Sequence, residues 1–149
     1  MPVRRAGRAA LVLVPLLVVA GCQDGVTKRV RSATYPPNFN YITPQQLKST
    51  MWQLADLVKR LDHTLASKPE TDASRRQQAI EILGSMADTA RALGPGDWPS
   101  NHPRVSRNIE AFRDAVRAAQ RDLQLDPPSY FRAGTIAGAC LSCHRALGV

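Results

Sequence analysis

Apolar residues recur along much of this chain at alternating intervals of three and four positions, which is the period of one helix face. The first such segment begins at Thr43-Pro44, where a residue that can cap a helix precedes a proline suited to the first helical position. Its apolar positions are Leu47, Met51, Leu54, Val58, Leu61 and Leu65. A segment from Pro103 to Leu123 repeats the spacing with Val105, Ile109, Phe112, Val116, Ala119 and Leu123. Both segments are predicted to be amphipathic helices.

Two more segments follow the helical pattern. One runs from about Ser74 to Leu93, stops at Gly94-Pro95-Gly96, and has the predicted inward positions Ile80, Leu83, Ala87, Ala90 and Leu93. The other begins near Pro127-Pro128 and continues to the C-terminus, with Phe131, Ile136 and Ala137 among its apolar residues. No segment alternates with a period of two, so no sheet is expected. Four amphipathic helices joined by short turns predict an all-α protein, an antiparallel four-helix bundle.

The N-terminus has the layout of a secretory signal, with three arginines, an apolar run over residues 9–20 and then Gly21-Cys22. The apolar run is short for a membrane span and contains Pro15. If the chain is cleaved near Ala20, this segment is an ordinary secretory signal and Cys22 is left as a free thiol. Residues 23–42 lack helical periodicity and contain Tyr35-Pro36-Pro37-Asn38. The predicted organisation is a signal over 1–21, a tether over 22–42 and one domain over 43–149.

Val19-Ala20-Gly21-Cys22 resembles the bacterial lipobox, an aliphatic residue and two small residues before a cysteine. The resemblance implies that Cys22 is acylated and anchors the protein to a bacterial membrane, on its periplasmic side. Several buried acyl chains make such an anchor stable. Gln23 stands where an aspartate would resemble an inner-membrane retention signal, which favours the outer membrane.

The net charge adds little to these predictions. The chain carries a formal +8, but removing the three signal arginines leaves 17 basic residues against 12 acidic ones. Aromatic residues make up only 5% of the chain and do not alternate with a basic run, so nucleic acid is not an expected partner.

The strongest chemical signal is Cys140-Leu141-Ser142-Cys143-His144, a C-x-x-C-H motif close to the C-terminus. This motif is the attachment signature of c-type haem, in which two thioethers hold the haem and the histidine ligates the iron. Positions 140, 143 and 144 share one face of a helix, so one turn carries all three groups. A thioredoxin-like pair would need a βαβ context, and a structural zinc site about two further ligands at defined spacing.

A helical bundle whose C-x-x-C-H motif lies at the extreme C-terminus resembles the cytochrome c′ family and its low-spin His/Met relatives. The resemblance covers residues 43–147 and includes the Gly94-Pro95-Gly96 turn before Trp98. It implies one covalent haem c on Cys140 and Cys143, with His144 as the proximal iron ligand. The family carries an aromatic residue and then a base shortly after this histidine, whereas Leu147 and Gly148 stand there in this chain. That departure weakens the case for five-coordinate gas binding.

Met51 is the methionine of the first helix, where family members place either an apolar residue or a methionine over the distal face of the haem. It is the predicted sixth ligand, with core packing as the alternative. His63 lies about 120° around that helix from Met51 and is expected in solvent. His102 precedes a helix start and is expected in a surface turn. Met86, on the second helix, lies away from the position where the family places its ligand.

The resemblance predicts an electron-transfer protein with a redox partner protein that the sequence does not identify. The alternative is a cytochrome c′-type protein that binds NO or CO at an open distal site. No enzyme is predicted, because no histidine or glutamate is placed as a distal acid or base. Some family members dimerise, which leaves a homodimer open.

Overall fold

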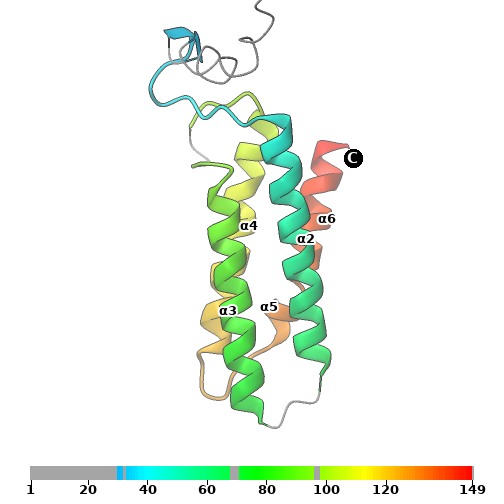
Figure 1. The fold of residues 1–149 in the computed structure, drawn as a ribbon. Helices are drawn as coiled ribbons and strands as arrows, with labels where there is room; N and C mark the ends of the chain where they lie inside the picture. Colours follow the sequence, from blue (N-terminus) through cyan, green and yellow to red (C-terminus); the bar gives the residue numbers. More distant parts are fainter. Residues whose placement is uncertain (1–29, 32, 68–70, 96–97, 149) are drawn as a thin grey trace, which may run out of the picture. The chain divides into compact units, whose positions relative to one another are not determined.

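The computed structural model describes residues 30–31, 33–67, 71–95 and 98–148. The described residues contain five helices and no strand, so the prediction of an all-α protein is confirmed. The helices are α2 (Pro44–Ala66), α3 (Asp72–Arg91), α4 (Pro103–Leu123), α5 (Phe131–Gly134) and α6 (Ile136–Leu147) (Figure 1). Residues 1–37 and residues 38–149 form two compact units, and all five helices belong to the second.

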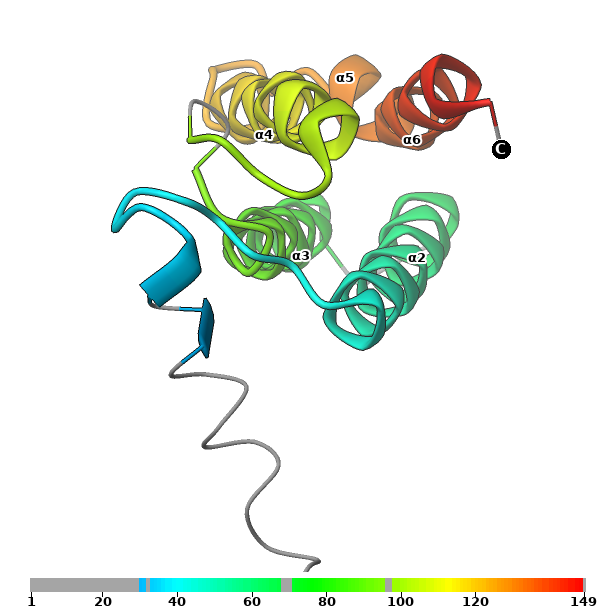
Figure 2. The same ribbon diagram turned by 90° about the horizontal axis from the view of Figure 1, so that it is seen from above.

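The helices of residues 38–149 lie side by side, and α2, α3, α4 and α6 successively reverse direction (Figure 1). α3 packs between α2 and α4, and α4 packs in turn against α5 and α6. α2 and α6 make little direct contact, although Figure 2 shows them as neighbours along one side of the group. A cavity lies on this side, between α2, α4 and α6.

Threonine caps fix the starts of the first two long helices. The Thr43 hydroxyl accepts a hydrogen bond from the Gln46 amide at 3.0 Å, and the Thr71 hydroxyl accepts one from Ser74 at 3.1 Å. Each bond satisfies one of the amides that a helix N-terminus leaves without a partner. The start predicted at Thr43-Pro44 is confirmed.

The core confirms the helical pattern fully on α4 and partly on α2 and α3. All six predicted inward positions of α4 are buried. On α2 and α3 the core also takes residues that the pattern missed, namely Leu57, Ala79, Ile82 and Met86. Met51 and Val58 are only partly buried against that core. The reason is that α2 faces α3 on one side and the space towards α6 on the other, so its apolar stripe is wider than one seam.

The predicted fourth helix is wrong in its start and in its continuity. It begins at Phe131, not near Pro127-Pro128, and it is interrupted at Thr135 between α5 and α6. Gly134 and the β-branched Thr135 both have low helix propensity, which explains why the backbone leaves the helical conformation there. The Phe131 side chain, expected among the apolar positions, is 76% exposed.

Residues 38–42, expected as the end of the tether, lie against the loop that joins α3 to α4. Ile42 is fully buried, and its amide and carbonyl pair with the side-chain amide of Asn101, each at 2.8 Å. The Asn40 side chain donates to the Leu93 carbonyl beside Gly94. Gly94 has a φ of +80°, a backbone conformation that residues other than glycine rarely adopt.

Gly94→Ala is expected to destabilise the protein by about 1–3 kcal/mol, because alanine is strained at this φ. The added methyl group would also overlap the Asn40 side chain. Thermal unfolding followed by circular dichroism would measure the loss. The matched control is Gly84→Ala inside α3, where the methyl group meets only Gln120 at an ordinary 3.5 Å and helix propensity improves. Equal stability of the two variants would contradict the prediction.

Candidate functional site

A cavity of about 410 Å³ lies between α2, α4 and α6, on the side where α2 and α6 make little contact. Its size is within the range of small-molecule and cofactor sites. Most of its wall is apolar. The lining residues are Met51, Leu54, Ala55, Val58, Lys59, Val105, Asn108, Ile109, Phe112, Ala137, Cys140, Leu141, Cys143 and His144.

The α6 wall of this cavity carries the whole C-x-x-C-H motif. Cys140 and Cys143 are free, half-buried thiols, and Cys140 packs against the core. His144 follows in the same turn and is exposed at the cavity wall. The helix thus presents two sulfur atoms and an imidazole to one apolar space, as predicted from their spacing.

Burial raises the pKa of the Cys140 thiol, and the neighbouring Cys143 raises it further. Burial also raises the pKa of Cys143. Dithiols that work in thiol–disulfide exchange have the opposite property, since their pKa values are lowered to supply a thiolate. The environment of these two cysteines therefore does not favour a thioredoxin-like role.

The α2 wall of the same cavity carries Met51. The structure thus brings Met51 and His144, 93 positions apart in the sequence, to one cavity. The other candidate ligands lie elsewhere. His63 is exposed and does not line this cavity, His102 is the half-buried residue that precedes α4, and Met86 is fully buried in the core.

Two polar residues of the cavity, Lys59 and Asn108, were missed by the sequence analysis. Lys59 lies two turns after Met51 on α2, and Asn108 precedes the core residue Ile109 on α4. Both positions flank predicted apolar stripes, and the helical period could have pointed to them once the cavity side of each helix was known. Arg145 does not line the cavity, and its guanidinium group donates to the Leu141 carbonyl at 3.4 Å.

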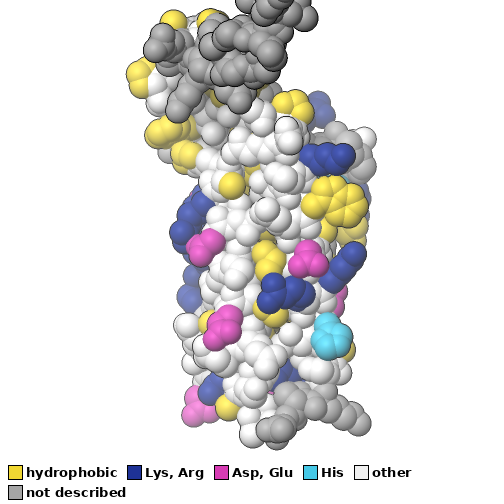
Figure 3. Space-filling model, in the orientation of Figure 1, with side chains coloured by type: hydrophobic (Ala, Val, Ile, Leu, Met, Phe, Trp, Pro, Cys, Tyr) yellow, Lys and Arg dark blue, Asp and Glu magenta, His cyan; other side chains and the backbone are white. Residues whose placement is uncertain are grey.

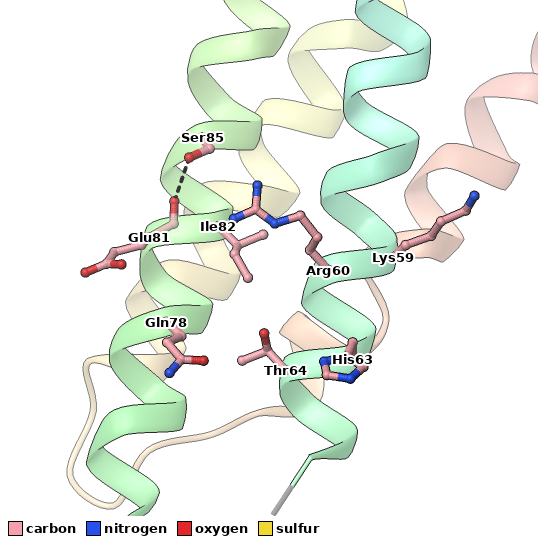
Figure 4. Close-up of a pocket in the computed structure, with 8 residues that line it drawn as sticks. All are labelled: Lys59, Arg60, His63, Thr64, Gln78, Glu81, Ile82 and Ser85. Carbon is pink, nitrogen blue, oxygen red and sulfur yellow. Dashed lines mark hydrogen bonds between the residues drawn. The ribbon is translucent and has the colours of Figure 1, made fainter. Parts of the chain in front are cut away.

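A second hollow, of about 550 Å³, lies between α2 and α3 and has a different character (Figure 4). The residues that line it are mainly polar or charged, and none belongs to the motif. Figure 4 shows Arg60 reaching towards α3, whereas Lys59 points away from this hollow. The cavity between α2, α4 and α6 would suit an apolar ring system such as haem better than this hollow would, because its wall offers fewer polar groups.

The described residues hold no group of three or more His, Cys, Asp or Glu side chains that could bind a metal ion by themselves. None of the described helices has the length and hydropathy needed to cross a membrane. Cys22 and the rest of the predicted signal lie outside the described residues, as does the side chain of Leu147. Comparisons with protein families, with curated proteins and with solved structures found no match to this chain.

Proposed function

We propose that this protein is a lipid-anchored c-type cytochrome of the cytochrome c′ kind, a four-helix bundle that binds one haem covalently and transfers electrons. One observation carries the proposal. A mainly apolar cavity has both cysteines and the histidine of a C-x-x-C-H motif on one wall, and a methionine on another. In this proposal α5 and α6 together serve as the fourth helix.

The residues of the cavity fit a haem. Cys140 and Cys143 would hold it through two thioethers, and His144 would ligate its iron. The side chains of Leu54, Val58, Val105, Ile109 and Phe112 would keep water from its faces. When bound, haem supplies a one-electron couple between ferrous and ferric iron, and a methionine ligand raises its reduction potential.

Electron transfer is favoured over catalysis by the wall that faces the motif. On α2 this wall contributes Met51, apolar side chains and Lys59, and on α4 apolar side chains and Asn108, so its lining residues include no histidine or carboxylate. A haem peroxidase needs an acid–base group close to the iron on that side. The thioether of Met51 would instead ligate the iron and occupy its sixth coordination position.

Binding of NO or CO is the second candidate function, because the same wall is apolar apart from Met51, Lys59 and Asn108. If Met51 does not ligate the iron, the side chains of Leu54 and Val58 would form an apolar distal pocket. Optical spectra of the purified oxidised and reduced holoprotein test the two functions. A six-coordinate low-spin spectrum supports electron transfer, whereas a high-spin spectrum with rapid CO binding supports gas binding. A protein without any haem spectrum contradicts both.

The lipid anchor is expected to depend on Cys22. Cys22→Ser should move the protein from the membrane fraction to the soluble periplasmic fraction, or block removal of the signal, because serine lacks the thiol that is acylated. Fractionation followed by mass spectrometry of the N-terminus measures both outcomes. Gln23→Asn is a control expected to remain membrane-bound. Normal processing and membrane retention of Cys22→Ser would show that the lipobox interpretation is wrong.

A further inference from the structure

Two large apolar side chains are exposed on α2 and α6, two of the three helices that border the cavity. Trp52 of α2 is 66% exposed, and Leu141 of α6 is 60% exposed and lines the cavity itself. Trp52 does not line the cavity itself, but it lies one turn before Ala55 of the cavity wall, on the same face of α2. Exposed tryptophan is typical of the energetic centres of protein interfaces.

Basic residues frame these two side chains. On α2, helical spacing places Lys48, Trp52, Ala55 and Lys59 on one face. On α6, Arg145 lies one turn after Leu141. Figure 3 shows basic and hydrophobic side chains next to one another along the α2 edge of the molecule, with acidic ones nearby.

The two lysines of this surface differ from five of the eleven arginines in residues 38–149. Arg75, Arg91, Arg113, Arg117 and Arg132 all form ion pairs with carboxylates. Within the described residues, neither Lys48 nor Lys59 forms one. α6 contains no acidic residue. Asp56, one turn after Trp52, is a carboxylate beside the surface.

We propose that Lys48, Trp52, Ala55 and Lys59 of α2, with Leu141 and Arg145 of α6, form a cavity-edge surface that docks an acidic electron-carrier protein. This inference rests on the proposed function, because the surface lies on α2 and α6 beside the cavity in which the haem would be bound. A protein seated there would lie over the opening through which an electron reaches the cavity's occupant. The basic residues would steer an acidic partner, and the two apolar side chains would hold it.

The charges argue against a second copy of this chain as the occupant, because a symmetric contact would bring like charges together. A flat anionic membrane is a weaker fit, since it would cover the opening from any carrier in water. Membrane binding is kept as an outcome of the test.

Flavodoxin, an acidic one-electron carrier, is the probe. Lipidated holoprotein in neutral phosphatidylcholine vesicles is sedimented with oxidised flavodoxin, and the bound fraction gives Kd. Binding is expected at low salt and should weaken by about tenfold or more at 0.2 M salt, as surface charges are screened. Lys48→Glu with Lys59→Glu should weaken low-salt binding by about tenfold or more. Trp52→Ser should weaken it while keeping the salt dependence, and Asp56→Asn should strengthen it.

The matched control is Arg107→Glu with Arg121→Glu, which changes the net charge equally at exposed positions of α4. It should alter Kd by less than about twofold. An equal effect of the two charge-reversed pairs, or no binding at low salt, would overturn the proposal. So would binding of the Cys22→Ser holoprotein to anionic phosphatidylglycerol vesicles through Trp52 while flavodoxin fails to bind. Flavodoxin binding needs no electron transfer, so failure of haem binding is seen separately in the optical spectrum.

Discussion

The double variant Cys140→Ala, Cys143→Ala is expected to contain no covalently bound haem. Both thiols line the cavity, and both would be converted to thioethers in the proposed holoprotein. Alanine offers no sulfur, so any haem that still enters would be held only by His144 and by apolar contacts. Acid–acetone extraction should then remove all haem from the variant and none from the unchanged protein.

The experiment has a control within the motif. Ser142 lies between the two cysteines, is exposed, and bonds through its hydroxyl to the Gly138 carbonyl of its own helix. Ser142→Ala should keep the covalent haem, because neither the sulfur atoms nor the imidazole changes. Each single cysteine variant should retain one thioether and a shifted reduced spectrum. Covalent haem in the double variant would refute the central proposal.

Loss of haem must be separated from failure to fold. Cys140 packs partly against the core, so its replacement removes some apolar contact. Circular dichroism should still show a helical protein, since α2, α3 and α4 build most of the core independently of the motif. A helical but haem-free variant is the expected result.

The sequence predicted the parts of the fold in which one apolar face meets one set of neighbours. α4 is such a helix, and its six predicted inward positions are all buried. The pattern was less accurate for α2, because a helix that faces both a core and a cavity buries a wider stripe. The break before α6 was missed because local propensity at Gly134 and Thr135 overrides the apolar spacing on either side.

Of the candidate site, too, the sequence could predict only the part that depends on local spacing. The motif could be found from sequence, since its chemistry depends on residues three and four apart on one helix. Bringing Met51 to the same cavity as the motif depends on tertiary packing, and the sequence could suggest this only through the resemblance. The exposure of Trp52 and Leu141 could not be predicted, because apolar residues are assigned inward by default.

Met51→Ala is expected to change the spectrum, the potential and the ligand binding of the haem together. If the Met51 thioether ligates the iron, the oxidised protein is low-spin and shows a weak long-wavelength sulfur-to-iron band. Alanine has no donor atom, so the band should vanish, the reduction potential should fall, and CO should bind at the open position. Optical titration and potentiometry of the purified holoprotein measure all three.

Met86→Ala is the matched control for this prediction. Met86 is fully buried on α3 and does not line the cavity, so its loss should destabilise the protein by about 2–5 kcal/mol without altering the haem spectrum. Met51 is only partly buried, so the stability loss at Met51 should lie near or below the lower end of that range. The two variants thus separate ligation from packing. A wild-type protein that is already high-spin would reduce Met51 to a packing residue and favour gas binding. A low-spin spectrum unchanged in Met51→Ala would require another sixth ligand, and His63 and His102 would have to move from their present positions to provide it.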